Sequence, residues 1–116
     1  MPFSRGDVVL VLYPDSNLRT AKRRPAIVVQ QDNLQTGLPQ VILSMISSNL
    51  SRAGHPSRIS ISKASPTGQQ MGLRTDSVVL TDNLATILDS EVDRVLGRMS
   101  DTTALDAALR HTFGLS

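Results

Sequence analysis

The segment from Arg19 to Gln30 constrains the fold of this chain more than any other part of the sequence. Its first half is cationic, its second half is an apolar run over residues 26–29, and Pro25 stands at the junction. Proline is tolerated at the first position of a strand and drives the preceding residue toward extended backbone. The pattern therefore predicts a strand that begins at Pro25 and holds Arg24 at its mouth, where the side chain can be aimed.

Further short strands are predicted wherever brief apolar or alternating runs lie between turn signals. They cover residues 8–13, 40–46, 57–62, 77–80 and 84–88. In the third of these runs polar and apolar residues alternate, which turns Ile59 and Ile61 inward. Several short strands of this kind are typical of a small β-barrel.

One clear helix is predicted at the end of the chain, from about Asp101 to Phe113. Ser100 can cap its first turn, and Gly114 is a suitable terminator. Three apolar residues at steps of four form a face expected to pack on the strands: Leu105, Leu109 and Phe113. The predicted fold is thus mainly β with a C-terminal α-helix, in a single domain over residues 1–116.

Charge is distributed unevenly along the chain. Positions 19–24 hold four cations and no acid: Arg19, Lys22, Arg23 and Arg24. Acids gather in the last third of the chain: Asp89, Glu91, Asp93, Asp101 and Asp106. A basic surface that faces one way favours a phosphate-bearing partner, although a solvated loop would show the same local pattern.

Missing residue types exclude several kinds of chemistry. The few aromatic residues argue against an RNA-binding platform of stacked rings. The sequence has no cysteine for thiol chemistry, and His55 and His111 lie far apart, so we expect no metal site and no cofactor. No apolar run approaches the ~20 residues of a membrane helix. The segment MPFSRGD lacks a signal-peptide pattern, so a cytoplasmic location without membrane attachment is expected.

Several ordered motifs together resemble a known family. They are Arg5–Val9, Arg24–Val29, Gly72-Leu73 followed by Asp76–Leu80, and the closing segment Leu109–Leu115. Their order and spacing are similar to those of the MazF/PemK (Kid) toxins of bacterial type II toxin–antitoxin systems. The resemblance implies an SH3-like barrel of the CcdB/MazF type with a C-terminal helix, and a homodimer.

The resemblance also implies an activity and two partners. Members of this family are metal-independent endoribonucleases that cut single-stranded mRNA at short sequences. Attack by the RNA 2′-hydroxyl leaves a 2′,3′-cyclic phosphate and a 5′-hydroxyl end. A cognate MazE-like antitoxin occupies the active groove.

Two residues match the family's catalytic positions. Arg24, directly before Pro25, falls at the place of the catalytic arginine, and a guanidinium can stabilise the charge on the phosphorane. Ser47 stands directly after the strand predicted over residues 40–46. The family usually has a threonine at this place, and serine keeps the hydroxyl. A one-residue shift would exchange it for Ser48. A structural arginine and turn-forming serines remain the alternatives.

Other residues are assigned supporting roles. Expected RNA contacts are Arg19, Lys22, Arg23, Ser48, Asn49 and Arg52. Many relatives carry a glutamate near the position of Arg19, so any acid–base role of that glutamate is missing here. Asp82 and His55 are possible supporting groups, but Leu80 replaces the arginine that accompanies the acid in Kid. A capping or solvated aspartate and an exposed loop histidine are the simpler interpretations.

Two functions of a different class remain open from the sequence. A relative without activity would be a non-catalytic SH3-like binding module. A CcdB-like protein of the same fold would inhibit DNA gyrase. The pairing of Arg24 with Ser47 favours the ribonuclease, because a protein-binding module needs no basic edge of this kind.

Overall fold

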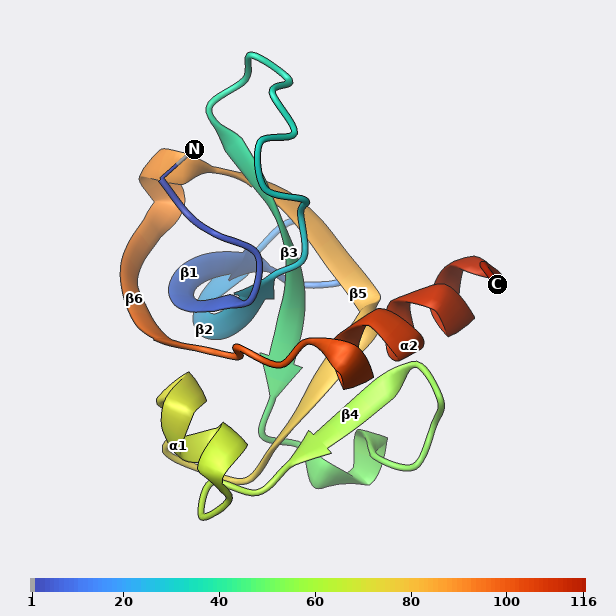
Figure 1. Cartoon of the computed structure of the whole chain (residues 1–116). Coiled ribbons are helices and arrows are strands. Elements are labelled where there is room, and N and C mark those ends of the chain that lie inside the picture. The colour runs from blue at the N-terminus through green and yellow to red at the C-terminus, as the bar shows by residue number, and fades with distance from the viewer. Residues whose placement is uncertain (1) are drawn as a thin grey trace.

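The structure, a computed structural model that describes residues 2–116, is built mainly of β-strands (Figure 1). Within these residues the strands are β1 (Asp7–Pro14), β2 (Ala21–Val28), β3 (Gln40–Ser47), β4 (Arg58–Ile61), β5 (Ser77–Leu88) and β6 (Val92–Arg98). The helices are α1 (Pro66–Met71) and α2 (Thr103–Phe113), with 3₁₀ turns η1 (Leu50–Arg52) and η2 (Asp89–Glu91). The prediction of a mainly β chain with a C-terminal helix is confirmed. The assignment of residues 1–116 to one domain stays a prediction.

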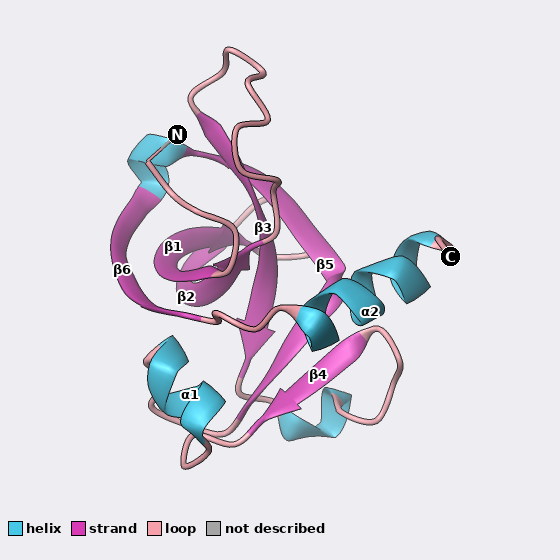
Figure 2. Ribbon diagram, viewed as in Figure 1, coloured by secondary structure: helices cyan, strands magenta, loops and turns pink. Residues whose placement is uncertain are grey.

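All strands join one antiparallel sheet in the order β4-β5-β3-β2-β1-β6, which curls strongly (Figure 2). Its two ends, β4 and β6, do not pair with each other, so the sheet is open and a closed barrel is not confirmed. Both halves of β5 pair with β3, but the pairing skips residues 81–83 of β5. Ser44 of β3 lies opposite Leu84, and the next residue, Met45, lies opposite Leu80. The extra residues 81–83 form a bulge, and a bulge bends a strand.

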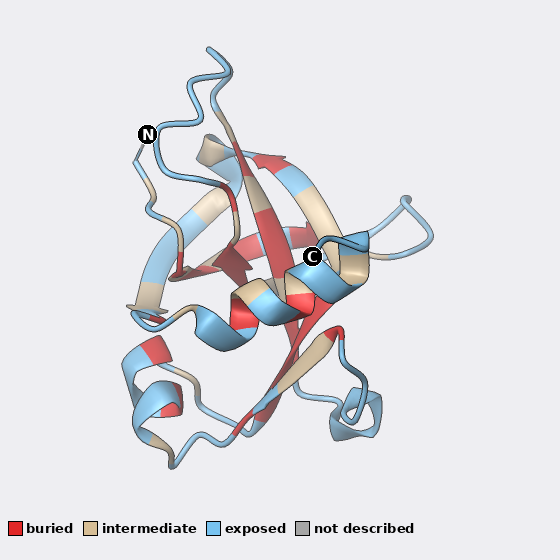
Figure 3. Ribbon diagram, turned by 45° about the vertical axis from the view of Figure 1, so that its right-hand side comes forward, coloured by how far each residue is buried: buried red, intermediate tan, exposed pale blue. Residues whose placement is uncertain are grey.

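Side chains of the curled sheet alternate between two apolar clusters, as the pleat requires. Val8 and Ile27 belong to the cluster that also receives Met71 at the end of α1 and Leu105 of α2. The neighbouring residues Val9, Val11, Tyr13, Ala26 and Val28 belong to the other cluster, with Leu43 of β3. Figure 3 shows that burial follows the central strands and the inner face of α2. This core holds β1 and β2 rigidly in place.

β2 starts earlier than the sequence analysis predicts, and the expected start at Pro25 is wrong. The strand begins at Ala21, so residues 22–24 are strand rather than loop, and Pro25 pairs with Leu10 of β1. β2 pairs with β3 only through residues 26–28. Pro25 therefore lies where β2 has a hydrogen-bonded neighbour on one side only, and such an edge tolerates a missing N–H.

Three other segments differ from the prediction. No helix is predicted from the sequence before the C-terminal one, and residues 65–68 indicate a loop, but residues 66–71 form α1. Pro66 suits the first helical turn, and the Ser65 hydroxyl accepts the N–H of Gly68 at 3.0 Å. The runs 77–80 and 84–88 are one strand, β5, joined through the bulge. β6 was not predicted at all, because its exposed and buried residues do not alternate cleanly.

α2 begins at Thr103, later than predicted, and Ser100 does not cap it. Asp101 instead accepts the N–H of Thr103 at 3.1 Å and its hydroxyl at 2.7 Å, which forms a turn before the helix. Leu105 is buried, but Phe113 is 57% exposed, because the last turn of α2 extends beyond the sheet (Figure 1). Gly114 ends the helix in the left-handed conformation, as predicted. Neither α1 nor α2, the α-helices of the described residues, has the length and apolar character of a membrane-spanning segment.

Candidate active site

Arg24 lies where β2 and β3 separate. β2 pairs with β3 up to Ala26, and before that residue it pairs only with β1. The Arg24 side chain is 30% exposed, and its Nη2 lies 3.2 Å from Oδ1 of Asp15, in the turn after β1. A rigid strand thus presents the guanidinium at an opening in the sheet, beside one carboxylate.

Hydrogen bonds to both oxygens favour the ionised form of Asp15. Its Oδ2 accepts the Thr20 hydroxyl at 2.6 Å while Oδ1 accepts from Arg24. The Thr20 hydrogen bond, then the Arg24 hydrogen bond and the nearby charge of Lys22, lower the pKa of Asp15. Because both oxygens are engaged and the carboxylate is a weak base, Asp15 positions Arg24 and is poorly suited to accept a proton.

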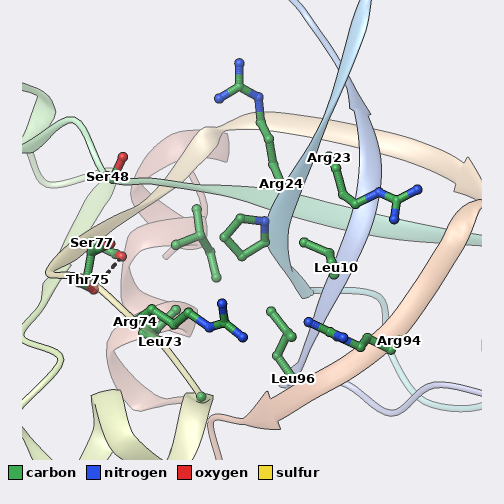
Figure 4. Close-up of a pocket in the computed structure, with 13 residues that line it drawn as sticks. Leu10, Arg23, Arg24, Ser48, Leu73, Arg74, Thr75, Ser77, Arg94 and Leu96 are labelled. Carbon is green, nitrogen blue, oxygen red and sulfur yellow. Dashed lines mark hydrogen bonds between the residues drawn. The ribbon is translucent and has the colours of Figure 1, made fainter.

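Two cavities meet at Arg24. The first, of about 380 Å³, lies against β2, β6 and the segment between α1 and β5 (Figure 4). The second, of about 320 Å³, lies between the turn after β1 and the exit of β3. Arg24 and Ser48 line both. A third cavity, of about 330 Å³, shares Asp15 and Arg52 with the second.

These three neighbouring cavities, which share lining residues, are together called the basic groove. Its cationic lining comes from β2, η1, β4, β6 and the segment before β5: Arg23, Arg24, Arg52, Arg58, Arg74 and Arg94. Among the lining residues that the structure describes, the only carboxylates are those of Asp15 and Asp82. Such an excess of guanidinium groups suits a polyanionic ligand.

The two candidate hydroxyls occupy different positions. Ser47, the last residue of β3, is 8% exposed and lines the second cavity, where its Oγ accepts the N–H of Asn49 at 3.1 Å. Ser48 is exposed and lines both cavities beside Arg24. The structure therefore brings both serines to the groove, and the assignment of the active hydroxyl to Ser47 stays a prediction.

The predicted RNA contacts divide into two groups. Arg23, Asn49 and Arg52 line the groove, and Arg23 also pairs at its rim with Asp93 of β6 at 3.5 Å. Arg19 and Lys22 are exposed near the start of β2 and line none of the three cavities. These two cations lie beside the groove and could meet only a ligand that extends out of it.

Asp82 and His55 have other partners. Asp82 accepts two hydrogen bonds from Arg58, from Nη2 at 2.8 Å and from Nε at 3.3 Å. This forked contact lowers the pKa of Asp82 and raises that of Arg58. His55 lies outside the three cavities, where its Nδ1 accepts the N–H of Ser57 and its ring contacts that of His111 edge-on. Asp82 reaches the third cavity as half of an ion pair.

Four charged residues of the groove were not singled out from the sequence: Asp15, Arg58, Arg74 and Arg94. Asp15 belongs to a run of turn-forming residues, which gave no reason to pair it with Arg24. Arg74 and Arg94 reach the first cavity only because α1 and β6 pack together, and no local pattern indicates that contact. Among residues 2–116, no group of three or more histidines and acids could hold a metal ion.

Comparison with known proteins identifies the family. The profile described as "PemK-like, MazF-like toxin of type II toxin-antitoxin system" matches residues 4–113, nearly the whole chain. The chain belongs to this toxin family. The MazF/PemK resemblance seen in the sequence is thereby confirmed.

Solved MazF-type structures share the fold. The Mycobacterium tuberculosis toxin MazF-mt6 superposes with a TM-score of 0.71 at 22% identity, over 97% of this chain and 99% of that one. A mycobacterial endoribonuclease in complex with its cognate antitoxin gives 0.72 at 20% identity, over 98% and 97% of the two chains. MazF from Deinococcus radiodurans gives 0.67 at 20% identity, over 98% and 97%. At such identities the likeness establishes a MazF-like fold.

Proposed function

We propose that this MazF/PemK-family chain is a metal-independent endoribonuclease that cuts single-stranded RNA at specific short sequences. The observation that carries the proposal is the placement of Arg24, fixed by a rigid strand and by Asp15 at the meeting point of two open cavities. The excess of guanidinium groups along the basic groove supports a polyanionic substrate. Similar solved proteins described as endoribonucleases support the same reading.

The reaction proceeds with the RNA, side chains of the groove and water. The RNA 2′-oxygen forms a bond to phosphorus, its proton passes to water, directly or through a serine hydroxyl, and the bond to the 5′-oxygen breaks. The departing oxygen takes up a proton from water, which leaves a 2′,3′-cyclic phosphate and a 5′-hydroxyl. A guanidinium carries five N–H donors. Asp15 engages one of them in Arg24, and the others can bind phosphate oxygens as charge develops there.

A serine hydroxyl completes the proposed machinery. Ser47 lies in the cavity next to Arg24 and can donate to a phosphate oxygen or relay a proton. Its Oγ already accepts from the Asn49 N–H, which leaves the hydroxyl proton free to point at the ligand. Ser48 is the neighbouring candidate.

We also infer a cognate antitoxin and a homodimer for this chain. Antitoxin complexes are known for similar proteins, the mycobacterial endoribonuclease and MazF from Deinococcus radiodurans. An acidic segment of such a partner would neutralise the basic groove and compete with RNA. Addition of purified antitoxin should therefore stop RNA cleavage at stoichiometric amounts.

The decisive experiment is incubation of the purified chain with end-labelled RNA in excess EDTA. We expect cleavage to 2′,3′-cyclic phosphate ends, and a loss of about 10²–10³-fold in Arg24→Ala, the cost typical of a lost transition-state donor. Arg24→Lys should recover little, because it loses the planar fork. Circular dichroism and thermal melting must show that both variants remain folded.

Other outcomes would favour the alternative functions. Intact RNA at high protein concentration, together with inhibition of DNA supercoiling, would identify a CcdB-like gyrase inhibitor. Intact RNA without that inhibition would identify a non-catalytic binding module. Cleavage that survives in Arg24→Ala would show that the catalytic group lies elsewhere.

A further inference from the structure

The first cavity, beside Arg24, is lined by more cationic side chains than a single catalytic arginine accounts for. Four guanidinium groups line it: Arg23, Arg24, Arg74 and Arg94. Arg23 and Arg24 pair with aspartates, but within residues 2–116 neither Arg74 nor Arg94 forms an ion pair. No carboxylate belongs to the described lining of this cavity. Two charged side chains are therefore available to a ligand.

The remaining lining of the first cavity is largely apolar. Leu10 and Leu96 lie among the arginines (Figure 4), and Pro25, Ile46 and Leu73 also line the cavity. A bare phosphate would gain nothing from such a surface, and an apolar peptide would meet unpaired guanidinium groups. A nucleotide combines a flat, largely apolar ring with a polar edge and an adjacent phosphate. The volume of about 380 Å³ lies within the ~300–1,000 Å³ range of small-molecule pockets.

The backbone segments that carry Arg74 and Arg94 are held together by a close contact. Gly72 ends α1 with φ 74°, and a Cβ at this position would collide with the carbonyl group of Leu96 on β6. Leu96 and Arg94, two residues apart on that strand, both line the first cavity. The turn that carries Arg74 thus packs directly on the strand that carries Arg94. The two guanidinium groups extend into the cavity from opposite sides (Figure 4).

We propose that the cavity lined by Arg74 and Arg94 binds a guanine base of single-stranded RNA next to the phosphate held by Arg24. The inference rests on the proposed function and names the base that the site would select. Arginine has only donors, and guanine presents two adjacent acceptors, O6 and N7, which one guanidinium can bind together. On the corresponding edge adenine and cytosine present an amino donor, which faces an arginine unfavourably. The apolar floor supplies a surface against which the ring lies.

The proposal is tested by binding and by cleavage in parallel. Four labelled 2′-deoxy pentanucleotides that differ only in the central base lack the attacking hydroxyl, so fluorescence anisotropy measures their binding without cleavage. We expect the guanine oligonucleotide to bind about tenfold or more tightly than the others, as good bidentate contacts do. Mapping of cut ends on a long RNA should show guanine at one fixed position beside the cut.

Single variants of Arg74 and Arg94 test whether these side chains cause the guanine preference. Arg74→Gln and Arg94→Gln should each reduce the guanine preference at that position about tenfold, while preferences at other positions persist. Arg110→Gln, on the exposed face of α2, removes the same charge outside the cavity and should leave the preference unchanged. Arg74→Lys and Arg94→Lys keep the charge without the fork and should also lose the preference. Melting curves verify that each variant is folded.

Each outcome decides between the two proposals. Equal binding of the four oligonucleotides by the unmodified chain, or a guanine preference that survives both glutamine variants, would overturn the guanine site. Cleavage without guanine at a fixed position would overturn it as well and leave the ribonuclease intact. Guanine-selective binding without any cleavage would retain the site and overturn the proposed activity.

Discussion

At the scale of single residues, the groove depends on how Asp15 and Arg24 divide their hydrogen bonds. Asp15 uses both oxygens, one on Thr20 and one on Arg24, whereas Arg24 uses one donor of several. The carboxylate therefore restrains the direction of the guanidinium and leaves most of its donors open. An arginine held in this way loses little side-chain entropy when it binds phosphate.

Replacement of Asp15 should disturb the orientation of the Arg24 side chain without weakening the affinity for RNA. Asp15→Asn keeps the shape but removes the charge, so we expect kcat to fall while RNA binding is retained. The pKa of Asp15 is lowered in the folded chain, so its stabilising contribution is present above the ordinary aspartate value of 3.8 and is lost as the pH falls through the lowered pKa. Urea unfolding should accordingly show the variant less stable at neutral pH and equal to the unmodified chain in strong acid.

The matched control is Asp93→Asn. Asp93 pairs with Arg23 across a longer distance, 3.5 Å, and both side chains are more exposed than those of Asp15 and Arg24. Loss of this rim pair should leave kcat unchanged. Equal effects of the two substitutions on kcat would contradict a positioning role for Asp15.

A pair of alanine variants identifies the active hydroxyl. Ser47→Ala should lower the cleavage rate by about 10²-fold, the lower range for acid–base assistance, with little change in RNA affinity. Ser48→Ala should leave cleavage nearly unchanged, because its exposed side chain is a contact rather than a reacting group. The opposite result, an active Ser47→Ala beside an inactive Ser48→Ala, would shift the assignment by one residue.

At the scale of elements, the bulge of β5 connects the sheet to α2. Thr81 lies in this bulge with 0% exposure, and its Oγ1 donates to the carbonyl of Ser57 at 2.5 Å. The same oxygen lies 2.7 Å from Oγ1 of Thr112 on α2. One buried hydroxyl thus joins the start of β4, the bent part of β5 and the last helix.

Removal of that hydroxyl should loosen α2. Thr81→Val preserves the shape of the side chain, so the lost hydrogen bonds should lower the free energy of unfolding by about 1 kcal/mol. Urea titration followed by circular dichroism measures the change. Thr86→Val, at an exposed position of the same strand, is the control and should have no comparable effect. Equal stability of the Thr81 variant would mean that α2 is held by its apolar face alone.

The sequence predicts elements well where one local signal dominates. β1, β3 and the C-terminal helix are marked by apolar runs or by a helical period, and each appears close to its predicted bounds. The predicted start of β2 was wrong because β2 continues through Pro25 into residues 21–24. A proline is tolerated there because β2 and β3 do not pair before Ala26, and no local sequence pattern shows that the two strands separate. β6 was missed because its residues are only partly buried and its strand state depends on pairing with β1.

At the scale of the whole molecule, candidate site residues gather from distant parts of the chain. Arg24 and Ser47 could be proposed from the sequence because each matches a catalytic position of the family that the sequence resembles, and both line the groove. Arg74 and Arg94 could not, since a packed helix and an unpredicted strand bring them to the same cavity. Arg19 shows the opposite case, a cation in the right segment that lies outside the groove.

The groove as a whole should bind RNA with a strong dependence on salt. Each phosphate contact contributes about −0.7 to the slope of log K against log salt for a single strand. Arg52, which lines two of the three cavities, is expected to supply one such contact. Arg52→Ala should reduce the slope by about 0.7 and weaken all RNA sequences alike, in anisotropy titrations with 2′-deoxy oligonucleotides. Arg110→Ala is the charge-matched control, and an unaltered slope in Arg52→Ala would exclude the contact.

The shared wall between the first two cavities has a practical consequence for inhibitors. Arg24 borders both compartments, so an inhibitor need not span the groove to disable it. A compact anionic compound bound in either cavity would engage the Arg24 guanidinium and, under the proposed function, compete with the RNA phosphate. Two chemically unrelated series of inhibitors, one for each cavity, should then each compete with the substrate. Because the Arg24 side chain borders both cavities, a short linker could join one compound of each series.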